Sequence, residues 1–319
     1  PCEPMAGPLA EAKKLVGQLK ASEALAPAQE ALDAFRAAAD QVGVAEALRP
    51  LLLAQIERGD VKPEEALKKV KEEAASLKRS ARDGRRAEAM LQFTQAAMHL
   101  AKAEPIKAAQ MAQEAEIYFQ REQDWPALAD VLLEVVAPAH LQRGDGKKAL
   151  EAANLVLDVA QKINDPEVQA RAWAVVAAGR FASGAEDAAE AARKALDLFR
   201  SCGSRVGEAQ TLVELARGQL TLQDSLSALA SAREAAKVAR DAGSWAQAGR
   251  AVEAIVEAQL QAGKPQAALE EAQEQLKWLS EVSPDSSSRK GVTSAMSAVV
   301  VATAALTGAD AGLEEVKGF

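Results

Sequence analysis

The sequence predicts an all-α fold, a solenoid of about seven antiparallel helix hairpins plus a closing C-terminal helix. Three observations predict it: a composition rich in helix formers, turn signals with a constant period, and apolar positions that share that period. Apolar residues make up 49% of the 319 residues and aromatic residues only 3%, with Ala and Leu dominating. Both are strong helix formers. The chain is therefore expected to contain helices and no strand.

Turn signals divide the chain into repeats of about 40 residues, each with two helices. One series begins at Gln41, Arg82, Gln123, Asn164, Gly203, Gly243 and Ser283. A second series lies between these positions and begins at Gly59, Ala103, Gly144, Ser183, Gln223 and Gly263. Two breaks per period indicate helices of roughly 15 to 20 residues, a common length in globular proteins. The pattern thus predicts about 15 helices.

Two columns of residues keep the same period. One column lies near the end of each second helix, at Phe35, Leu77, Phe119, Val159, Phe199, Ala239 and Leu279, in steps of 40 to 42 residues. The other is a pair of small residues just after each inner turn, such as Ala108-Ala109 and Ala188-Ala189. Small residues allow two helices to cross closely, as a hairpin requires. We expect Phe119 and Phe199 to occupy equivalent positions two repeats apart.

The inner turns resemble those of tetratricopeptide repeats. The segment Gly144-Asp145-Gly146-Lys147-Lys148-Ala149-Leu150-Glu151-Ala152-Ala153 is similar to the turn and second helix of that repeat, and Gly59-Asp60 and Gln223-Asp224 are similar to its turn. The period of about 40 residues resembles the long-helix variants found in kinesin light chain and in bacterial signalling sensor arrays. The resemblance covers nearly the whole chain. It implies a right-handed superhelix in which the first helices of the hairpins line a concave groove.

The repeats define three parts of the chain. Residues 1–22 are expected to form an N-terminal segment and the first helix of the opening hairpin. Residues 23–284 form the helical repeats, and residues 285–319 form a capping helix and a tail. Each hairpin cannot bury its apolar face alone, so its neighbours must stack on it.

The predicted closing helix lacks the polar outer face that a terminal repeat needs in water. No charged residue occurs between Gly291 and Ala309. This stretch is short and rich in Ser, Thr and Ala for a membrane span of about 20 apolar residues, so we interpret it as a closing helix and predict no transmembrane span. We expect a partner protein or a second copy of the chain to dock against it. The contacts would come from Met296, Val299, Val300 and Val301.

The charge balance argues against nucleic-acid binding. The chain has 38 basic and 46 acidic residues, a net charge of −8, which opposes association with a polyanion. One local exception runs from Lys78 to Arg86, with five basic residues and one acidic residue. We interpret it as a solvated helix end and turn in preference to an anion site, because cations suit a helix C-terminus.

The sequence offers little for metal or acid–base chemistry. Its only histidines, His99 and His140, both fall near the end of a first helix, and Gln55, Arg180, Gln219 and Gln259 occupy the same column. A polar column repeated once per hairpin favours hydrogen bonding between stacked hairpins over metal binding, since no Cys or close carboxylate joins the two histidines. No phosphate loop or nucleophile motif is present. We predict a non-catalytic protein without metal or cofactor.

Candidate partner-binding residues follow from the resemblance. Its groove-facing spacing, projected onto the first helices, selects Met90, Phe93, Trp173, Arg180, Phe181, Arg217, Arg250 and Glu253, and adds Val131, Glu134 and Leu141 from the fourth hairpin. Helical spacing equally allows Trp173 to belong to the core. Pro138 lies inside a predicted helix over residues 126–142, and it is expected to kink that helix and widen the groove.

These features predict a scaffold or adaptor that binds other proteins through its groove and its C-terminal end, as a subunit of a larger assembly. One alternative is a peripheral structural subunit of a large organellar complex, photosynthetic or respiratory, associated with a membrane complex without spanning the membrane. Another is a sensor module that binds a small ligand. The expected location is intracellular, either the cytoplasm or, if Pro1 is a processed start, the interior of an organelle.

Overall fold

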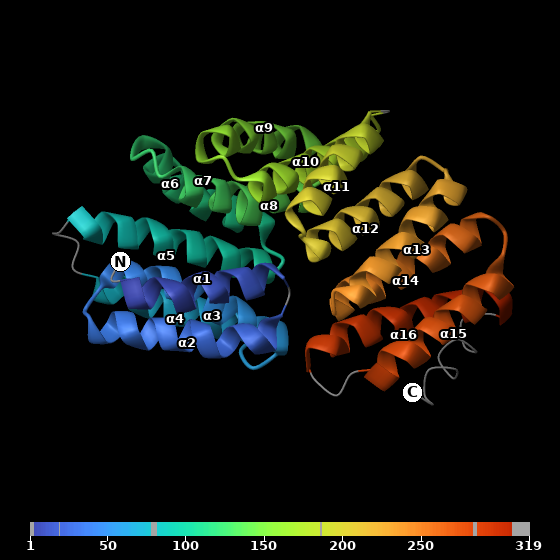
Figure 1. Ribbon diagram of the computed structural model, residues 1–319, viewed down its shortest axis with the longest axis horizontal. Coiled ribbons are helices and arrows are strands. Elements are labelled where there is room, and N and C mark those ends of the chain that lie inside the picture. The colour runs from blue at the N-terminus through green and yellow to red at the C-terminus, as the bar shows by residue number, and fades with distance from the viewer. Residues whose placement is uncertain (1–2, 19, 78–81, 186, 283–285, 308–319) are drawn as a thin grey trace. The chain divides into compact units, whose positions relative to one another are not determined.

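The computed structural model describes residues 3–18, 20–77, 82–185, 187–282 and 286–307 (Figure 1). Over these residues the chain forms helices and no strand. The segments α7 (Trp125–Val131), η1 (Leu132–Val136) and α8 (Ala137–Gln142) run without a break, and with these counted as one the described residues form 15 helices. The all-α class and the seven hairpins with a closing helix are confirmed.

The helices fall into two compact units, residues 1–175 and 176–319, which divide within α10 (Pro166–Ala182). The other helices of the first unit, unit 1, are α1 (Glu3–Gly17), α2 (Ala21–Ala37), α3 (Gln41–Arg58), α4 (Pro63–Ser76), α5 (Arg82–Ala101), α6 (Pro105–Arg121), α7 to α8, and α9 (Gly146–Ile163). The second unit, unit 2, contains α11 (Ala188–Cys202), α12 (Arg205–Thr221), α13 (Ser225–Asp241), α14 (Trp245–Gln261), α15 (Pro265–Val282) and α16 (Ser286–Thr307).

Within each unit the first helices of successive hairpins stack on one another. In unit 1, α1 packs on α3, α3 on α5, and α5 on η1, while α2, α4, α6 and α9 complete the hairpins. In unit 2, α12 packs on α14, and α14 on α16. At least one member of each pair of small residues is buried, as Ala108 and Ala188 show, whereas the neighbouring Ala109 and Ala189 are half-buried. Alanine at these crossings brings the helix backbones close together.

The outer turns repeat with the same backbone geometry. The N–H of Asp124 donates to the carbonyl of Phe119 at 2.9 Å, and the N–H of Ser204 donates to that of Phe199 at 2.9 Å. This six-residue closure is typical of a helix that ends on a left-handed residue. Both phenylalanine side chains are buried. Phe119 and Phe199 therefore do occupy equivalent positions two repeats apart.

The predicted column is displaced by one residue in the fourth hairpin. The left-handed residue of the outer turn comes four positions after Phe119 and Phe199, at Gln123 and Gly203. In the fourth hairpin it is Asn164, with φ of 51°, so the equivalent column residue is Ala160 and not Val159. Both are buried, which is why the apolar pattern alone could not separate them.

The polar column lies at the inner turns, but it joins the two helices of one hairpin and not stacked hairpins. Each contact pairs the column residue with the start or body of the following helix: His99 Nδ1 with Glu104 Oε2 at 2.7 Å, Arg180 with Asp187 at 2.9 Å, Ser231 Oγ donating to Gln219 at 2.8 Å, Gln259 Nε2 donating to Glu271 at 2.5 Å, and His140 near Asp145 at 3.9 Å. The backbone carbonyl of each column residue also accepts the hydrogen bond that closes the inner turn. The side chain of each column residue therefore lies beside the second helix of its own hairpin.

Pro138 is preceded by a π turn. The N–H of Ala137 donates to the carbonyl of Leu132, five residues earlier, within η1. Pro138 has no N–H to give to the carbonyl of Glu134, and its ring would clash with that carbonyl in a regular α-helix. The wider π turn relieves this conflict. The departure from α geometry was predicted at the correct place, although as a kink.

The closing helix α16 packs against α14 and α15. A Cβ atom on Gly249 would overlap the backbone of Gly291, so the two helices cross with their backbones in contact. Among the described residues, the window Lys290–Thr307 is long and apolar enough to cross a membrane by length and composition, and 33% of it is buried. Val299 is fully buried, Val300 is half-buried, and Val301 remains 49% exposed.

The pair of His99 and Glu104 predicts a pH effect. The hydrogen bond with His99, a second one from Lys107, and the charge of Lys102 lower the pKa of Glu104 from 4.5 to about 2. Because the folded pKa is depressed, this stabilisation is present above about pH 4.5 and is lost as the pH falls towards about 2. In Glu104→Gln, the difference in melting temperature from the wild type should therefore be largest near neutral pH and should shrink across this window. A difference that stays constant from pH 7 to pH 2.5 would contradict the assignment.

Candidate functional site

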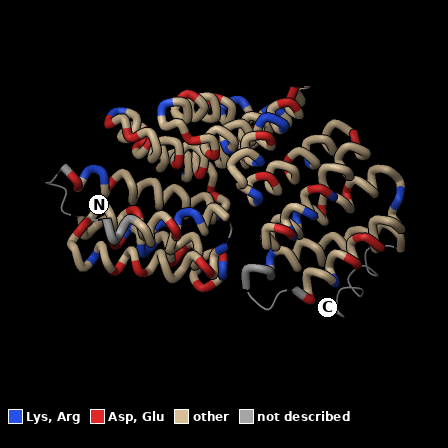
Figure 2. Tube along the Cα trace, viewed as in Figure 1, with Lys and Arg blue, Asp and Glu red and all other residues tan. Residues whose placement is uncertain are grey.

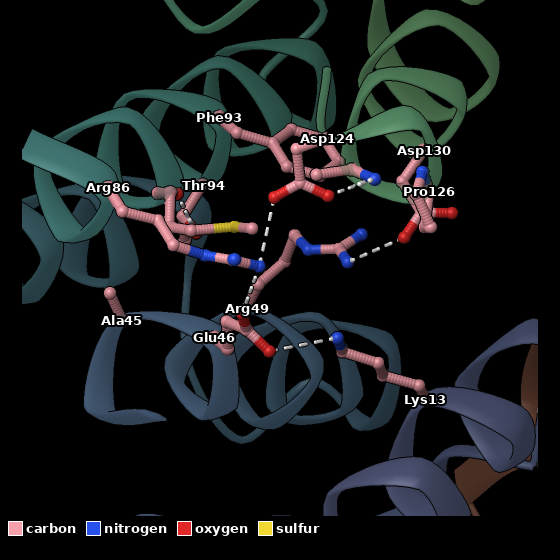
Figure 3. A pocket seen from close by; sticks show the side chains of 12 residues that line it. Lys13, Ala45, Glu46, Arg49, Arg86, Phe93, Thr94, Asp124, Pro126 and Asp130 are labelled. Atoms are coloured by element: carbon pink, nitrogen blue, oxygen red, sulfur yellow. Dashed lines mark hydrogen bonds and ion pairs between the residues drawn. The ribbon is translucent and has the colours of Figure 1, made fainter. Parts of the chain in front are cut away.

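A cavity of about 90 Å³ opens on the face of unit 1 that is formed by the first helices α1, α3, α5 and α7, here called the inner face (Figure 3). Its apolar lining includes Met90 and Phe93. Its ionisable lining comprises Lys13, Glu46, Arg49, Arg86, Asp124 and Asp130. Three of these residues are basic and three are acidic, so the charges of the lining balance.

Helical spacing places these residues together. Glu46 and Arg49 are three residues apart on α3, so both lie on one side of that helix. Arg86, Met90 and Phe93 follow the same spacing on α5. Asp124 precedes α7, and its carboxylate accepts from the N–H of Ala127 at 3.4 Å as a helix cap. Stacking of the first helices then brings the three groups to one cavity.

One set of ion pairs runs across four hairpins. Glu46 lies between two cations, with Lys13 Nζ at 3.3 Å and Arg86 Nη2 at 3.1 Å. The same Arg86 nitrogen lies 3.0 Å from Asp124 Oδ2. Lys13 and Arg86 keep 36% and 42% of their side chains exposed. These outer groups are therefore accessible to a molecule that approaches the cavity.

A second set of ion pairs is centred on Arg49, which is buried with 6% exposure. Its guanidinium lies over the ring of Phe93, 4.2 Å from the ring centroid. One nitrogen donates to Glu134, and another lies 3.6 Å from Asp130. Arg171 on α10 lies 3.9 Å from Asp130 and 3.8 Å from Glu134. Arg49 thus connects the second hairpin to the fourth across the third.

The pKa values reflect how these charges are matched. Burial alone would lower the pKa of Arg49, but Glu134 and Asp130 raise it above its ordinary value. Burial would raise the pKa of Glu134, but Arg49 and Arg171 lower it. For Asp130, burial and the neighbouring Glu134 raise the pKa more than the two arginines lower it. Arg49 and Glu134 are the well-matched ions, and Asp130 is the less compensated one.

The arrangement is suited to binding. The ionisable groups neutralise each other in pairs, and within the described ranges no group of three or more His, Cys, Asp or Glu side chains could hold a metal ion. Figure 2 shows acidic and basic residues interspersed along the helices of each unit. The inner face can accept polar groups through the exposed parts of Lys13, Arg86 and Asp130.

The predicted groove residues divide between the two units. In unit 1, Met90 and Phe93 both line the cavity, although Phe93 is only 1% exposed because Arg49 covers it. Trp173 is half-buried on α10. Val131 points into the core and is fully buried, whereas Glu134 reaches Arg49.

The other predicted groove residues belong to unit 2. Arg180 pairs with Asp187 in the inner turn, and the ring of Phe181 lies against Gly218, where no Cβ would fit. Arg250 pairs with Glu214. Arg217 is exposed and Glu253 is half-buried.

Sequence reasoning missed Arg49, Arg86, Asp130 and Arg171 as members of one site. Arg49 carried a usable signal, because it is the one charged residue in the apolar stretch from Ala47 to Ala54. Arg86 was assigned to a solvated helix end, and this was wrong. Helix α5 begins at Arg82, so Arg86 lies in its first turns, where Glu46 and Asp124 supply the negative charge. Residues 78–81 of that basic run lie outside the described residues.

Comparison with known proteins identifies the fold. No family model matches the sequence, and no curated protein matches it. A solved Rap protein, complexed with Competence and Sporulation Factor, superposes with a TM-score of 0.69 over 100% of this chain and 87% of its own, at 16% identity. The apo form of RapI gives a TM-score of 0.58 over 98% and 84%, at 13% identity.

A third solved structure is a signal-transduction ATPase with numerous domains from Pyrococcus horikoshii, which carries a tetratricopeptide repeat sensor. It superposes with a TM-score of 0.60 at 17% identity. The match covers 92% of this chain but only 46% of that protein. Identities this low establish the fold alone. The chain therefore has the tetratricopeptide-like α-solenoid fold that the inner turns resemble.

The buried pair of Arg49 and Glu134 predicts a large stability effect. Arg49→Ala leaves two partly buried carboxylates with the half-exposed Arg171 as their nearest cation, at 3.8 to 3.9 Å, and we expect it to lower the free energy of unfolding by about 2 kcal/mol or more. The matched control is Arg233→Ala, which removes an arginine paired with Glu271 on the exposed surface of α13 and α15 and should cost less than about 1 kcal/mol. Urea unfolding followed by circular dichroism would measure both. Equal losses of unfolding free energy in the two variants would show that the buried ion pair of Arg49 contributes no more to stability than an exposed one.

Proposed function

We propose that the chain is a non-catalytic scaffold or adaptor that binds partner proteins through the inner face of its repeats and through its closing helix. The observation that carries the proposal is the cavity of unit 1, where ionisable side chains from four successive hairpins converge and remain partly accessible. Helical packing fixes these side chains before a partner arrives. A preformed surface avoids much of the ordering cost of association.

The similar structures support a binding protein. One of them is a Rap protein in complex with a separate factor, and another carries its repeats as a sensor. In this chain the inner-face groups pair with one another and are not poised as acid, base or nucleophile. Membership of a larger assembly fits a partly exposed closing helix that has no charged residue between Gly291 and Thr307.

A small-ligand sensor is the second candidate, and the same cavity favours it. Its volume of about 90 Å³ admits a small polar molecule or a single side chain. Isothermal calorimetry with fractionated small-molecule extract would identify such a ligand. Capture from native extract on the immobilised full chain, followed by mass spectrometry, would identify protein partners. Recovery of a ligand with no enriched protein would overturn the adaptor proposal in favour of the sensor.

Trp173 lies on α10, outside the four helices that define the inner face, and it tests whether the proposed binding surface extends to this next first helix. Large aromatic residues near the centre of an interface contribute most of the binding energy, so Trp173→Ala should weaken partner binding by roughly 2 kcal/mol. Ile117→Ala is the matched control, because Ile117 is 58% exposed on the second helix α6. Binding would be measured by surface plasmon resonance with the captured partner. If Trp173→Ala unfolds the chain instead, Trp173 belongs to the core and another inner-face residue is the anchor.

The closing helix offers an independent test. Val301 is exposed on α16, in a helix where Met296 and Val300 are also only half-buried. A charge at this point would have to be buried in a docked complex, so Val301→Lys should reduce docking at least about ten-fold while leaving the fold intact. Leu226→Lys, at an apolar residue that is 74% exposed on α13, is the matched control. Equal behaviour of the two variants in size-exclusion light scattering and in partner capture would remove α16 from the proposed interface.

A further inference from the structure

We propose that Arg49 is a binding residue for an acidic side chain of a partner protein, and that Glu134 of the same chain occupies it in the free state. The inference rests on the proposed function, since it specifies the chemistry of a partner at the inner face. Glu134 would then act as an internal substitute for the partner's carboxylate.

The geometry around Arg49 is that of a carboxylate site. Its guanidinium carbon lies over the Phe93 ring, 4.2 Å from the centroid, and its nitrogens reach Asp130 on α7 and Glu134 on η1. An arginine fixed in this way presents paired N–H groups that match a carboxylate. The cavity beside it is open to a molecule outside and is lined by Met90 and Phe93. A partner residue could therefore place its carboxylate on Arg49 and its methylene groups against Met90 in the wall of the cavity.

The present occupant of Arg49 has an alternative cation. One carboxylate oxygen of Glu134 accepts a hydrogen bond from Arg49. The other oxygen of Glu134 lies 3.8 Å from Arg171. Asp130 is shared in the same way, at 3.6 Å from Arg49 and 3.9 Å from Arg171. A small movement toward Arg171 would keep both carboxylates paired and would release Arg49. Displacement of Glu134 from Arg49 thus leaves no buried charge without a counter-ion, so it avoids the large free-energy cost of an unpaired buried ion.

The helix that carries Glu134 is also the least regular one in unit 1. Glu134 lies within the π turn of η1, four positions before Pro138. A π turn closes its hydrogen bond one residue further along the chain than an α turn, and it occurs frequently at functional sites. Glu134, which pairs with Arg49, therefore lies in the helix segment of unit 1 whose local geometry departs from the α form.

Chemical rescue tests this site without a known partner. In the full chain, Glu134→Ala vacates the place of one carboxylate while leaving Arg49 in position. Acetate should then raise the melting temperature of this variant and should bind about ten-fold or more tightly than to the wild type, because a hydrogen bond to a charged group is restored. Acetamide, which has the same shape without the charge, should have no such effect. The double variant Arg49→Gln/Glu134→Ala should lose the response to acetate.

The matched control is Glu208→Ala in unit 2. Glu208 is also a buried carboxylate held by two arginines, Arg200 at 2.7 Å and Arg205 at 2.8 Å, but neither of these arginines lines the cavity that Arg49 lines. An equal response of the Glu208 and Glu134 variants to acetate, or a response that persists without Arg49, would overturn the proposal. If Glu134→Ala does not fold, Glu134→Ser, which also vacates the place of the carboxylate, replaces it with the same expected order. Failure of acetate rescue overturns the occupied site alone, whereas failure of partner capture overturns the proposed function.

Discussion

Close crossing of helices through alanine and glycine is the constraint on which the rest of this structure depends. Ala108 and Ala188 are fully buried where two helices of a hairpin meet, and Gly249 and Gly291 bring α14 and α16 into backbone contact. Small residues bury little apolar side-chain area, so a single hairpin has only a small hydrophobic core of its own. Stability must come from stacking one hairpin on the next, as in other repeat arrays. The first helices then lie close enough for side chains from several hairpins to meet.

Arg49 is a consequence of that proximity. A buried cation is costly unless carboxylates and hydrogen bonds surround it, and its own hairpin supplies neither of the carboxylates that it contacts. Glu134 and Asp130 come from the fourth hairpin, across the ring of Phe93 on the third. A pair of this kind fixes the relative placement of three hairpins, whereas apolar contacts between alanines are less specific about register. We infer that the ion pairs of the inner face contribute more to the specificity of stacking than to its free energy.

Local periodicity predicted the fold almost completely, and it predicted the site only in part. Turn residues and apolar columns act over a few positions of sequence, so the helices, the equivalence of Phe119 and Phe199, and the disturbance at Pro138 could be read directly. Glu134 was placed on the groove side by the spacing that the resemblance to tetratricopeptide repeats implies. Its partner could not be found, because a contact between residues 49 and 134 depends on how three hairpins stack. The polar column shows the same limit: its positions were correct, but its direction toward the second helix of its own hairpin required the turn geometry.

The inner face of unit 1 differs from a simple open groove because its strongest groups already have partners. Lys13, Arg86 and Asp130 remain accessible at the edge, while Arg49 and Phe93 lie beneath them and are covered. A partner would first meet the accessible charges, which are balanced and would therefore steer it weakly. Tight binding would need the deeper groups, and reaching them means exchanging one carboxylate for another. Such an exchange selects partners by the position of a single acidic group and not by overall charge, which is how a chain with a net charge of −8 could still recognise an acidic residue.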